Sequence, residues 1–248
     1  MKTAVIAVTE SAKSTAEVIS SALSDCTLLY SREKGWLKAN AGHLFASYDG
    51  LIFIMASGIV VRMLAPHIDS KYNDPAVVVV DDAERYAISL LSGHEGGANA
   101  LTARVSTILN ACPVITTASD TNRRIIIGVG CRRGTTADEI SSAATAALQK
   151  AGLNWEDVRA AATIDIKHDE AGITECFTCK GLPVFYFTKD QINSFDGTFS
   201  ISSTAMKYLG VKAVAEPSAL LAGRRASLIL DKQKTETVTI ALAKEDTI

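Results

Sequence analysis

The chain has 248 residues, of which 48% are hydrophobic and 6% aromatic, and its formal net charge is −2. This length suits two compact units, and the aliphatic content is typical of an α/β interior and argues against a disordered chain. The charge gives no basic footprint for nucleic acid, and no uncharged apolar run approaches the roughly 20 residues that span a bilayer. Because the opening residues MKTAVIAVTES predict a strand rather than a signal peptide, we expect a cytoplasmic protein.

The first half of the chain alternates between strand and helix patterns. Apolar runs with β-branched residues predict strands, and apolar residues spaced by three or four predict the helices between them. The predicted strands are 2–9, 26–30, 51–55 and 113–116, and the predicted helices are 11–23, 41–47, 59–64 and 98–109. The segment AVVVVDDAERYAISLL holds two further strand-like runs around a short polar turn, which predicts a hairpin and therefore an antiparallel pair.

The polar segment 118–123 predicts a linker between two domains, an N-terminal hydrolase-type α/β domain of residues 1–121 and a C-terminal α/β domain of residues 122–248. The second begins with the strand IIIGVG, the turn CRRG and a helix over 136–150, for which Thr135 or Thr136 is the expected N-cap. Further strands are predicted at 162–166, 183–187, 227–230 and 238–242. The predicted fold class is α/β, with two sequential units that each have a mostly parallel sheet with helices on its faces.

Small or polar turns follow four of the predicted strands. In open α/β sheets, ligands bind beyond the carboxyl ends of the strands, so these turns are the first places to look for a site. They are Ser57-Gly58, Asp81-Asp82, SGHEGGAN (Ser92 to Asn99) and 128–134. A helix that starts at Gly58 or Ala98 would also offer free backbone N–H groups to a carboxylate or an oxyanion.

Within SGHEGGAN, His94 is the candidate general acid or base, because only histidine has an ordinary pKa near neutrality. Glu95 could orient the imidazole or share its task. The alternative is a structural turn, in which His94 only satisfies a local hydrogen bond. In that case the remaining residues cap the turn or give it backbone freedom: Ser92, Gly93, Gly96, Gly97 and Asn99.

Charged residues near the other turns also allow two interpretations. Asp82, with its neighbours Asp81 and Glu84, could supply a carboxylate base, but acids that end strands are usually solvated turn residues. Arg62 follows Ser57-Gly58 on the predicted helix, where it could reach an anionic ligand or point to water.

The turn GVGCRRG, residues 128–134, resembles a loosened dinucleotide fingerprint between a strand and a helix. Its third glycine comes one residue late, and no acidic residue ends a strand about 20 positions further on, so an anion-binding turn fits better than a nicotinamide site. Arginine doublets, here Arg132-Arg133, would suit a substrate with many carboxylates or would be solvated surface pairs.

The five cysteines are odd in number and scattered, which predicts reduced thiols rather than a disulfide framework. The pair Cys176-x-x-Cys179 has no partner pair and no nearby set of histidines, so neither zinc nor a redox role is expected.

Several segments together resemble the cobalt-precorrin-5A hydrolase family, CbiG, of anaerobic cobalamin (vitamin B12) biosynthesis. They are GIVVRMLAP, DPAVVVVDDAERYAISLLSGHEGGANALT, PVITTASD, GVGCRRGT, ATIDIKHDE and VAEPSALLA. Many members of this family carry a variable middle segment, whereas here the two blocks are joined almost directly. The resemblance is therefore to a compact form of the family.

The resemblance implies a hydrolase that acts on a carbon–carbon bond of a cobalt corrinoid. Water opens a δ-lactone between a ring A acetate and the extruded meso carbon, and acetaldehyde then leaves to give cobalt-precorrin-5B. For this reaction we assign His94 as the base, with Glu95 and Asp82 as further catalytic candidates. The predicted substrate-binding residues are Ser57, Gly58, Arg62, Ser92, Gly93, Gly96, Gly97, Asn99, Gly130, Arg132, Arg133 and Glu216.

Within that assignment, backbone N–H groups of Ser57-Gly58 or of Gly96-Gly97 would bind the oxyanion, and the arginines would bind peripheral carboxylates. Glu216 is expected to begin a helix and to face the site. No resident metal or cofactor is expected, because the substrate carries the cobalt.

The expected partner is the small corrinoid, without nucleic acid or membrane, and a homodimer or transient contacts with neighbouring pathway enzymes stay open. One competing hypothesis is a non-catalytic corrinoid-binding or carrier protein, because the C-terminal block alone resembles a small protein of the aerobic pathway. A nicotinamide-dependent enzyme is the other, and it rests only on GVGCRRG.

Overall fold

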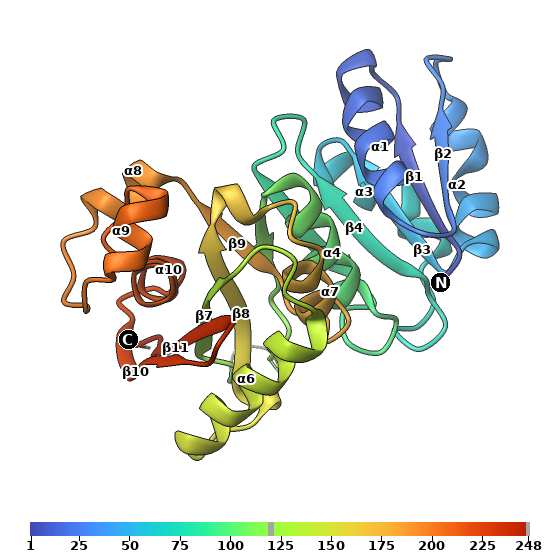
Figure 1. Ribbon diagram of the computed structural model, residues 1–248. Helices are drawn as coiled ribbons and strands as arrows, with labels where there is room; N and C mark the ends of the chain where they lie inside the picture. Colours follow the sequence, from blue (N-terminus) through green and yellow to red (C-terminus); the bar gives the residue numbers. More distant parts are fainter. Residues whose placement is uncertain (119–121, 247–248) are drawn as a thin grey trace. The chain divides into compact units, whose positions relative to one another are not determined.

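The computed structural model describes residues 1–118 and 122–246, and the chain divides into two compact units, Met1–Thr117 and Ala118–Ile248 (Figure 1). The boundary predicted at Thr121 and part of the linker 118–123 lie outside the described residues. Each unit is built around its own sheet, with six strands in the first and five in the second. The predicted α/β class with two sequential units is therefore confirmed.

Strands and helices alternate in the first unit. Its strands are β1 (Thr3–Ala7), β2 (Cys26–Tyr30), β3 (Gly50–Ile54), β4 (Ala76–Val80), β5 (Tyr86–Leu91) and β6 (Cys112–Val114). Its helices are α1 (Glu10–Ala22), α2 (Trp36–Ser47), α3 (Ser57–Leu64) and α4 (Ala98–Leu109), with a 3₁₀ turn at Ala65–His67. Most bounds agree with the prediction, but α2 starts at Trp36 rather than at residue 41, directly after Gly35, whose φ of 89° sets the start of the helix.

The first sheet has the strand order β2-β1-β3-β4-β5-β6. Strands β1 to β4 are parallel, the predicted hairpin makes β5 antiparallel to β4, and β6 is parallel to β5. Helices α1 and α4 cover the face that carries Val5 and Ile52, and α2 and α3 cover the face that carries Ile6 and Phe53 (Figure 1). The central strands are thus buried on both faces, as their unbroken apolar runs predict.

The second unit has its own set of strands and helices. Its strands are β7 (Ile125–Cys131), β8 (Val158–Ile164), β9 (Val184–Phe187), β10 (Ser227–Lys234) and β11 (Val238–Lys244). Its helices are α6 (Ala137–Lys150), α7 (Ala171–Thr178), α8 (Lys189–Ser194), α9 (Ser203–Leu209) and α10 (Ala215–Ala222), with 3₁₀ turns at Trp155–Asp157 and Asp165–Lys167. The strand predicted at 162–166 begins earlier, at Val158, and ends where the second 3₁₀ turn starts.

The second sheet has the order β10-β11-β7-β8-β9, in which β7, β8 and β9 are parallel and β11 runs against its two neighbours. Helices α6 and α7 pack on the face of Ile125 and Ile127, and α10 packs on the face of Ile126. Thr136 caps α6 in a reciprocal capping box with Glu139, as predicted. None of the helices in residues 1–118 and 122–246 has the length and apolar character that a membrane span requires.

Candidate functional site

The second unit contains a cavity of about 830 Å³ beyond the carboxyl end of β7. Its walls come from the end of β7, helix α9, the start of α10 and the β10–β11 hairpin. Four of the predicted substrate-binding residues line it, namely Gly130, Arg132, Arg133 and Glu216. Its volume falls in the range of roughly 300–1,000 Å³ that is usual for small-molecule sites.

Positive charge dominates the lining of this cavity. Five cationic side chains line it, against the two acids Glu216 and Glu236: Arg132, Arg133, Lys167, Lys232 and Lys234. The three lysines were not predicted from the sequence, because they follow β8 or lie on β10 and come close to the arginines only in the folded unit. Only Lys167 had a sequence signal, since it belongs to the segment ATIDIKHDE. A concave, cationic surface of this kind suits an anionic ligand.

The turn after β7 is occupied by a carboxylate of the protein itself, that of Glu170. The Gly134 N–H donates to the carboxylate of Glu170 at 2.9 Å, and Lys167 Nζ donates to the same group at 3.0 Å. Burial alone raises the pKa of Glu170, which is 6% exposed, but these hydrogen bonds outweigh burial and lower the pKa. The ionised carboxylate therefore joins the segment GVGCRRGT to ATIDIKHDE. The sequence predicted that this turn binds an anionic ligand, but the Gly134 N–H is already used by Glu170.

Packing within the unit explains the glycine spacing of GVGCRRG. A Cβ atom at Gly128 would collide with the carbonyl oxygen of Ala215 in the first turn of α10. Gly130 has ordinary space and lines the cavity, and Gly134 has a φ of 76°, which favours glycine. The first glycine of the motif is thus explained by the close packing of α10 against β7 and not by a bound pyrophosphate. This removes the basis of the nicotinamide hypothesis.

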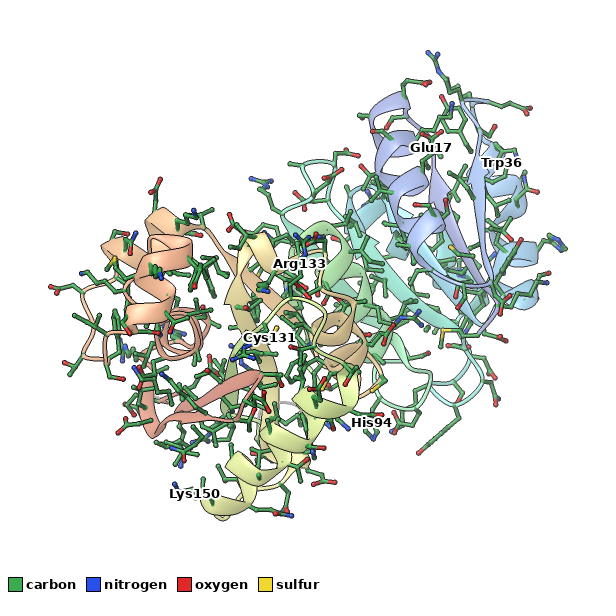
Figure 2. All side chains as sticks on the ribbon, viewed as in Figure 1. Glu17, Trp36, His94, Cys131, Arg133 and Lys150 are labelled. Carbon is green, nitrogen blue, oxygen red and sulfur yellow. The ribbon has the colours of Figure 1, made fainter. Side chains whose placement is uncertain are left out.

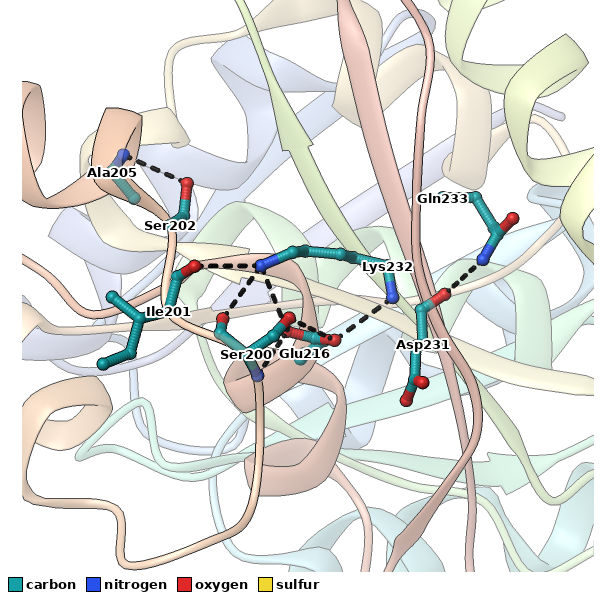
Figure 3. Close-up of polar contacts among 8 residues, drawn as sticks. All are labelled: Ser200, Ile201, Ser202, Ala205, Glu216, Asp231, Lys232 and Gln233. Atoms are coloured by element: carbon teal, nitrogen blue, oxygen red, sulfur yellow. Dashed lines mark hydrogen bonds and ion pairs between the residues drawn. The ribbon is translucent and has the colours of Figure 1, made fainter.

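Glu216 lies in the first turn of α10, as predicted, and is 1% exposed. Its carboxylate accepts hydrogen bonds from the backbone N–H of Ser200 at 3.1 Å, from Ser200 Oγ at 2.8 Å and from the backbone N–H of Lys232 at 3.2 Å (Figure 3). These bonds join α10 to β10 and to the segment before α9. The acceptor sites of Glu216 are therefore used inside the protein.

All five cysteines are free. Cys131 lines the cavity, and burial raises the pKa of its thiol, so it lies there uncharged at neutral pH. Burial also raises the pKa of Cys176 to about 11. A neutral, buried Cys176 is a poor nucleophile, which agrees with the expectation that Cys176-x-x-Cys179 has no redox role.

In the first unit, the SGHEGGAN turn lies at the opposite edge of the sheet from Ser57-Gly58 and Asp82. Leu91 at the end of β5 pairs with Val77 near the start of β4, and Ala87 pairs with Val80 at the end of β4. Because the five residues of β4 rise about 3.3 Å each, roughly 15 Å separates the two edges. His94, Asp82 and Ser57-Gly58 were predicted to share one site. That grouping is wrong, because the hairpin reverses the direction of the strand that leads to His94.

The SGHEGGAN turn is closed by hydrogen bonds of its own. The N–H groups of Ala98 and Asn99 donate to the carbonyl oxygens of Ser92 and Gly93, at 3.1 and 2.9 Å. The start of α4 therefore does not offer these two N–H groups to an oxyanion, which corrects the expectation for a helix that begins at Ala98. Gly97 precedes the helix with a φ of 86°, a conformation that favours glycine.

Packing accounts for most other residues of this turn. The side-chain oxygen of Asn99 accepts from Ser89 Oγ at 2.8 Å, and its nitrogen donates to Thr117 Oγ1 at 2.8 Å. A Cβ at Gly96 would collide with the side chain of Ser92, which itself has a φ of 56°. These contacts favour the structural interpretation of this part of the turn.

His94, which Figure 2 labels, is the exception in the turn. Its side chain is exposed, and no hydrogen bond joins it to the described residues. Glu95 does not orient it. The Glu95 carboxylate instead accepts from Lys71 Nζ at 2.7 Å, and this hydrogen bond lowers the pKa of Glu95. The imidazole of His94 is thus available to a ligand, but without the carboxylate partner that the sequence suggested.

Ser57 and Gly58 lie at the topological switch point of the first sheet, beyond the carboxyl ends of β1 and β3. Both are exposed, and α3 begins there without a side-chain cap. The Arg62 guanidinium folds back along the helix to within 3.6 Å of the Cβ position of Gly58. The structure therefore brings these three residues together, as predicted, but apart from His94.

Asp82 is exposed in the turn between β4 and β5. Its neighbour Asp81 accepts from the Tyr86 N–H at 2.7 Å and from Arg85 Nε at 3.0 Å, which stabilises the hairpin. The solvated-turn interpretation of these acids fits the structure better than a catalytic one.

The chain thus has two α/β units, and the second has a cationic cavity at the carboxyl end of its first strand. The family described as Cobalamin synthesis G N-terminal matches residues 40–120, and Cobalamin synthesis G C-terminus matches residues 125–243. A cobalt-precorrin-5A hydrolase of Priestia megaterium is 30% identical, over 81% of this chain and 79% of that protein. One of Salmonella typhimurium is 26% identical, over 85% and 88%. The chain belongs to the cobalt-precorrin-5A hydrolase family of cobalamin biosynthesis.

Other matches cover one or both units. Protein CobE of Sinorhizobium is 31% identical, over 50% of this chain and 82% of that protein. A crystal structure of CobE matches 50% of this chain and 92% of the CobE chain, with a TM-score of 0.47. A putative cobalamin biosynthesis protein G homolog from Sulfolobus solfataricus covers 98% of this chain and 97% of its own, at 22% identity and a TM-score of 0.39. The Priestia megaterium alignment spans 298 positions, more than this chain has, so that protein carries segments absent here, as expected of a compact form.

Proposed function

We propose that this protein is a cobalt-precorrin-5A hydrolase of anaerobic cobalamin biosynthesis. The observation that carries the proposal is the cationic cavity of about 830 Å³ in the second unit, in a chain whose relatives from Priestia megaterium and Salmonella typhimurium have that name. A corrinoid intermediate carries carboxylates around its rim, and charge-assisted hydrogen bonds from arginine and lysine are the usual way to hold such groups.

In the proposed reaction, water adds to the carbonyl carbon of the ring A δ-lactone. The bond from that carbon to the ring oxygen breaks, which leaves the ring A acetate and a hydroxyethyl group on the macrocycle. A base then takes the hydroxyl proton, the bond between the hydroxyethyl carbon and the macrocycle breaks, and acetaldehyde leaves. The conjugated ring and its cobalt, both parts of the substrate, accept the electron pair, so the protein needs no resident cofactor for this step.

His94 is the base in this proposal, because its imidazole is exposed, makes no hydrogen bond to the described residues, and histidine is the most frequent general base in enzymes. The neighbouring Gly96-Gly97 backbone would receive the oxyanion. Ser57, Gly58 and Arg62 form a separate exposed group that would bind a different anionic part of a ligand. Glu95 and Asp82 have no catalytic part, since Lys71 holds the first and the second lies at the other edge.

The test is to incubate the 248-residue chain with enzymatically prepared cobalt-precorrin-5A and to measure acetaldehyde. We expect one acetaldehyde for each lactone that is opened. Folded protein that binds the corrinoid and releases no acetaldehyde would contradict the hydrolase function.

A second candidate function is that of a non-catalytic corrinoid carrier. The cavity lies wholly within the second unit, the part of the chain that contains the Cobalamin synthesis G C-terminus match. Tight corrinoid binding without acetaldehyde, unchanged by substitution of His94, would favour this function.

A further inference from the structure

Some of the five cationic side chains that line the cavity already form hydrogen bonds or ion pairs within the protein. Lys232 Nζ donates to the carbonyl oxygens of Ser200 and Ile201, at 3.0 and 3.2 Å, and lies 3.9 Å from the Glu216 carboxylate (Figure 3). The two carbonyl oxygens accept hydrogen bonds from the ammonium group, and the nearby Glu216 carboxylate balances its charge. Lys232 therefore serves the protein itself.

Together, Glu216 and Lys232 form a clasp that builds one wall of the cavity. The Glu216 carboxylate holds the N–H and hydroxyl of Ser200, while the Lys232 side chain holds the carbonyl side of the same segment. The clasp fixes the residues before α9 against α10 and β10. Because Glu216 is 1% exposed, loss of either partner would leave a buried charge unpaired.

Lys167 and Arg133, which also line the cavity, have acidic partners in the same unit. Lys167 Nζ donates to Glu170 at 3.0 Å, and both side chains are largely buried. Arg133 pairs with Asp169 and lies 3.8 Å from Glu170. Lys167 holds the turn after β7 in place, and the charge of Arg133 is already paired with acids of the protein, so the part predicted for Arg133 in substrate binding passes to other residues.

Of the five cations that line the cavity, Arg132 and Lys234 are left as candidates to bind a ligand. Both are exposed, both line the cavity, and neither makes an ion pair with a carboxylate in residues 1–118 or 122–246. Arg132 directly follows β7, and its backbone N–H donates to the Thr237 carbonyl at 2.9 Å, while Lys234 ends β10. Glu236, in the hairpin turn, also lines the cavity but pairs with neither of them.

An aromatic ring completes the lining on the side of α9. Tyr208 lines the cavity and is 72% exposed, and Lys207 Nζ lies 5.3 Å from the centroid of its ring. An exposed ring of this kind stacks on flat conjugated groups. The cavity therefore combines free cations with a flat apolar face, which suits a planar polycarboxylate better than a small inorganic anion.

We infer that Arg132 and Lys234 bind carboxylates on the rim of the corrinoid, whereas Lys232, Lys167 and Arg133 only build the cavity. This inference rests on the proposed function, because it takes the corrinoid as the ligand. It assigns to Lys234 a part in substrate binding that its position in the sequence did not suggest. Lys234 gives charge alone, whereas the planar guanidinium of Arg132 can bind a carboxylate through two parallel hydrogen bonds.

The test compares Arg132→Met and Lys234→Met with Lys244→Met, an exposed lysine at the far end of β11 that does not line the cavity. The probe is a stable cobalt corrinoid with its side chains as free acids, and its affinity is measured by calorimetry on the 248-residue chain. We expect each of the first two substitutions to weaken binding about tenfold or more, and Lys244→Met to leave it unchanged. Equal losses in all three variants, or no loss in the first two, would overturn the inference.

The methyl ester of the same corrinoid provides a test that needs no variant. It keeps the macrocycle and removes the carboxylate charges, so we expect wild-type protein to bind it at least tenfold more weakly than the free acid. Equal affinity for acid and ester would overturn the inference even if a variant failed to fold.

Acetaldehyde release separates this inference from the proposed function. Binding that depends on Arg132 and Lys234 without acetaldehyde would keep the inference and remove the hydrolase. Acetaldehyde release by wild type with unchanged affinity and turnover in both variants would remove the inference alone.

Discussion

The two glycine-rich turns of this protein look alike in sequence and differ in the structure. GVGCRRG ends β7, which is parallel to β8 and, beyond β8, to β9, so these three strands end at the same edge, and GVGCRRG lines the cavity there. SGHEGGAN follows β5, which runs against β4, so it lies at the edge where the parallel strands begin. The direction of the preceding strand therefore decides which turn shares an edge with the other strand ends. For the same reason His94 acts, in our proposal, without Asp82 or Ser57.

The turns also differ in how the protein uses their backbone and charge. In the second unit, the Glu170 carboxylate accepts a hydrogen bond from the Gly134 N–H. Three cations around the cavity, Lys167, Lys232 and Arg133, also have partners in the same unit. In the first unit, SGHEGGAN closes on itself and leaves the imidazole of His94 exposed. This difference is the reason why the proposed function uses the cavity for binding and His94 for proton transfer.

The largest expected effect is on the second unit, from Gly128→Ala. Its Cβ would collide with the carbonyl oxygen of Ala215, so we expect the free energy of unfolding to fall by about 3 kcal/mol or more, measured by urea denaturation. Gly130→Ala is the matched control, because its Cβ would lie 3.7 Å from Val214, an ordinary contact. Equal stability of the two variants would contradict the packing explanation of the motif.

For the first turn, His94→Ala should reduce acetaldehyde release by about 10²–10⁴-fold with unchanged corrinoid affinity, since a positioned general base contributes about that much. Asp82→Asn should leave turnover unchanged, because the hairpin places it at the other edge. His43→Ala, an exposed histidine on α2, is the control for loss of an imidazole. Near-normal turnover of His94→Ala would remove that residue from the mechanism.

A smaller effect is expected from Glu170→Gln, which removes the charge that holds the turn after β7. Glu170 is buried and accepts charge-assisted hydrogen bonds, so we expect a loss of about 1–3 kcal/mol at neutral pH. Asp169→Asn, which breaks only an exposed pair with Arg133, should cost less than about 0.5 kcal/mol. If the two variants are equally stable, Glu170 does not hold this turn.

The difference in the free energy of unfolding between wild type and Glu170→Gln should depend on pH. The pKa of Glu170 is lowered in the folded state, so its contribution is present above the ordinary carboxyl range and is lost as pH falls through the lowered pKa. The stability difference between wild type and Glu170→Gln should therefore narrow towards acid pH in a series of urea titrations. A difference that grows on acidification would mean that the sign of the shift is wrong.

The smallest expected effect is at the SGHEGGAN turn, where Lys71→Met should raise the pKa of Glu95 towards its ordinary value. The hydrogen bond from Lys71 is the main cause of the lowered pKa, and both groups lie at the surface. A carboxyl titration followed by NMR measures the shift, with Lys34→Met as a surface control. If the pKa of Glu95 stays low, His94 rather than Lys71 is its partner.

Much of the fold could be predicted from local sequence patterns. The apolar runs of β3 and β4, the helical spacing of α1 and α4 and the capping box at Thr136 all report on contacts within a few residues. Bounds were less accurate where no local signal marks them, as at the start of α2 and of β8. The hairpin between β4 and β5 was also predicted, but the resulting position of His94, at the edge where β4 begins, was not.

The sequence by itself determined the α/β class, the two units, the family and the residues of the two turns. Only the tertiary structure decided which of those residues meet: it separated His94 from Asp82, placed Lys234 beside Arg132 on one cavity, and gave Glu170 to the turn after β7. The physical reason is that apolar periodicity reports which side chains are buried. Which strands lie side by side, and in which direction, depends on contacts between residues far apart in the chain.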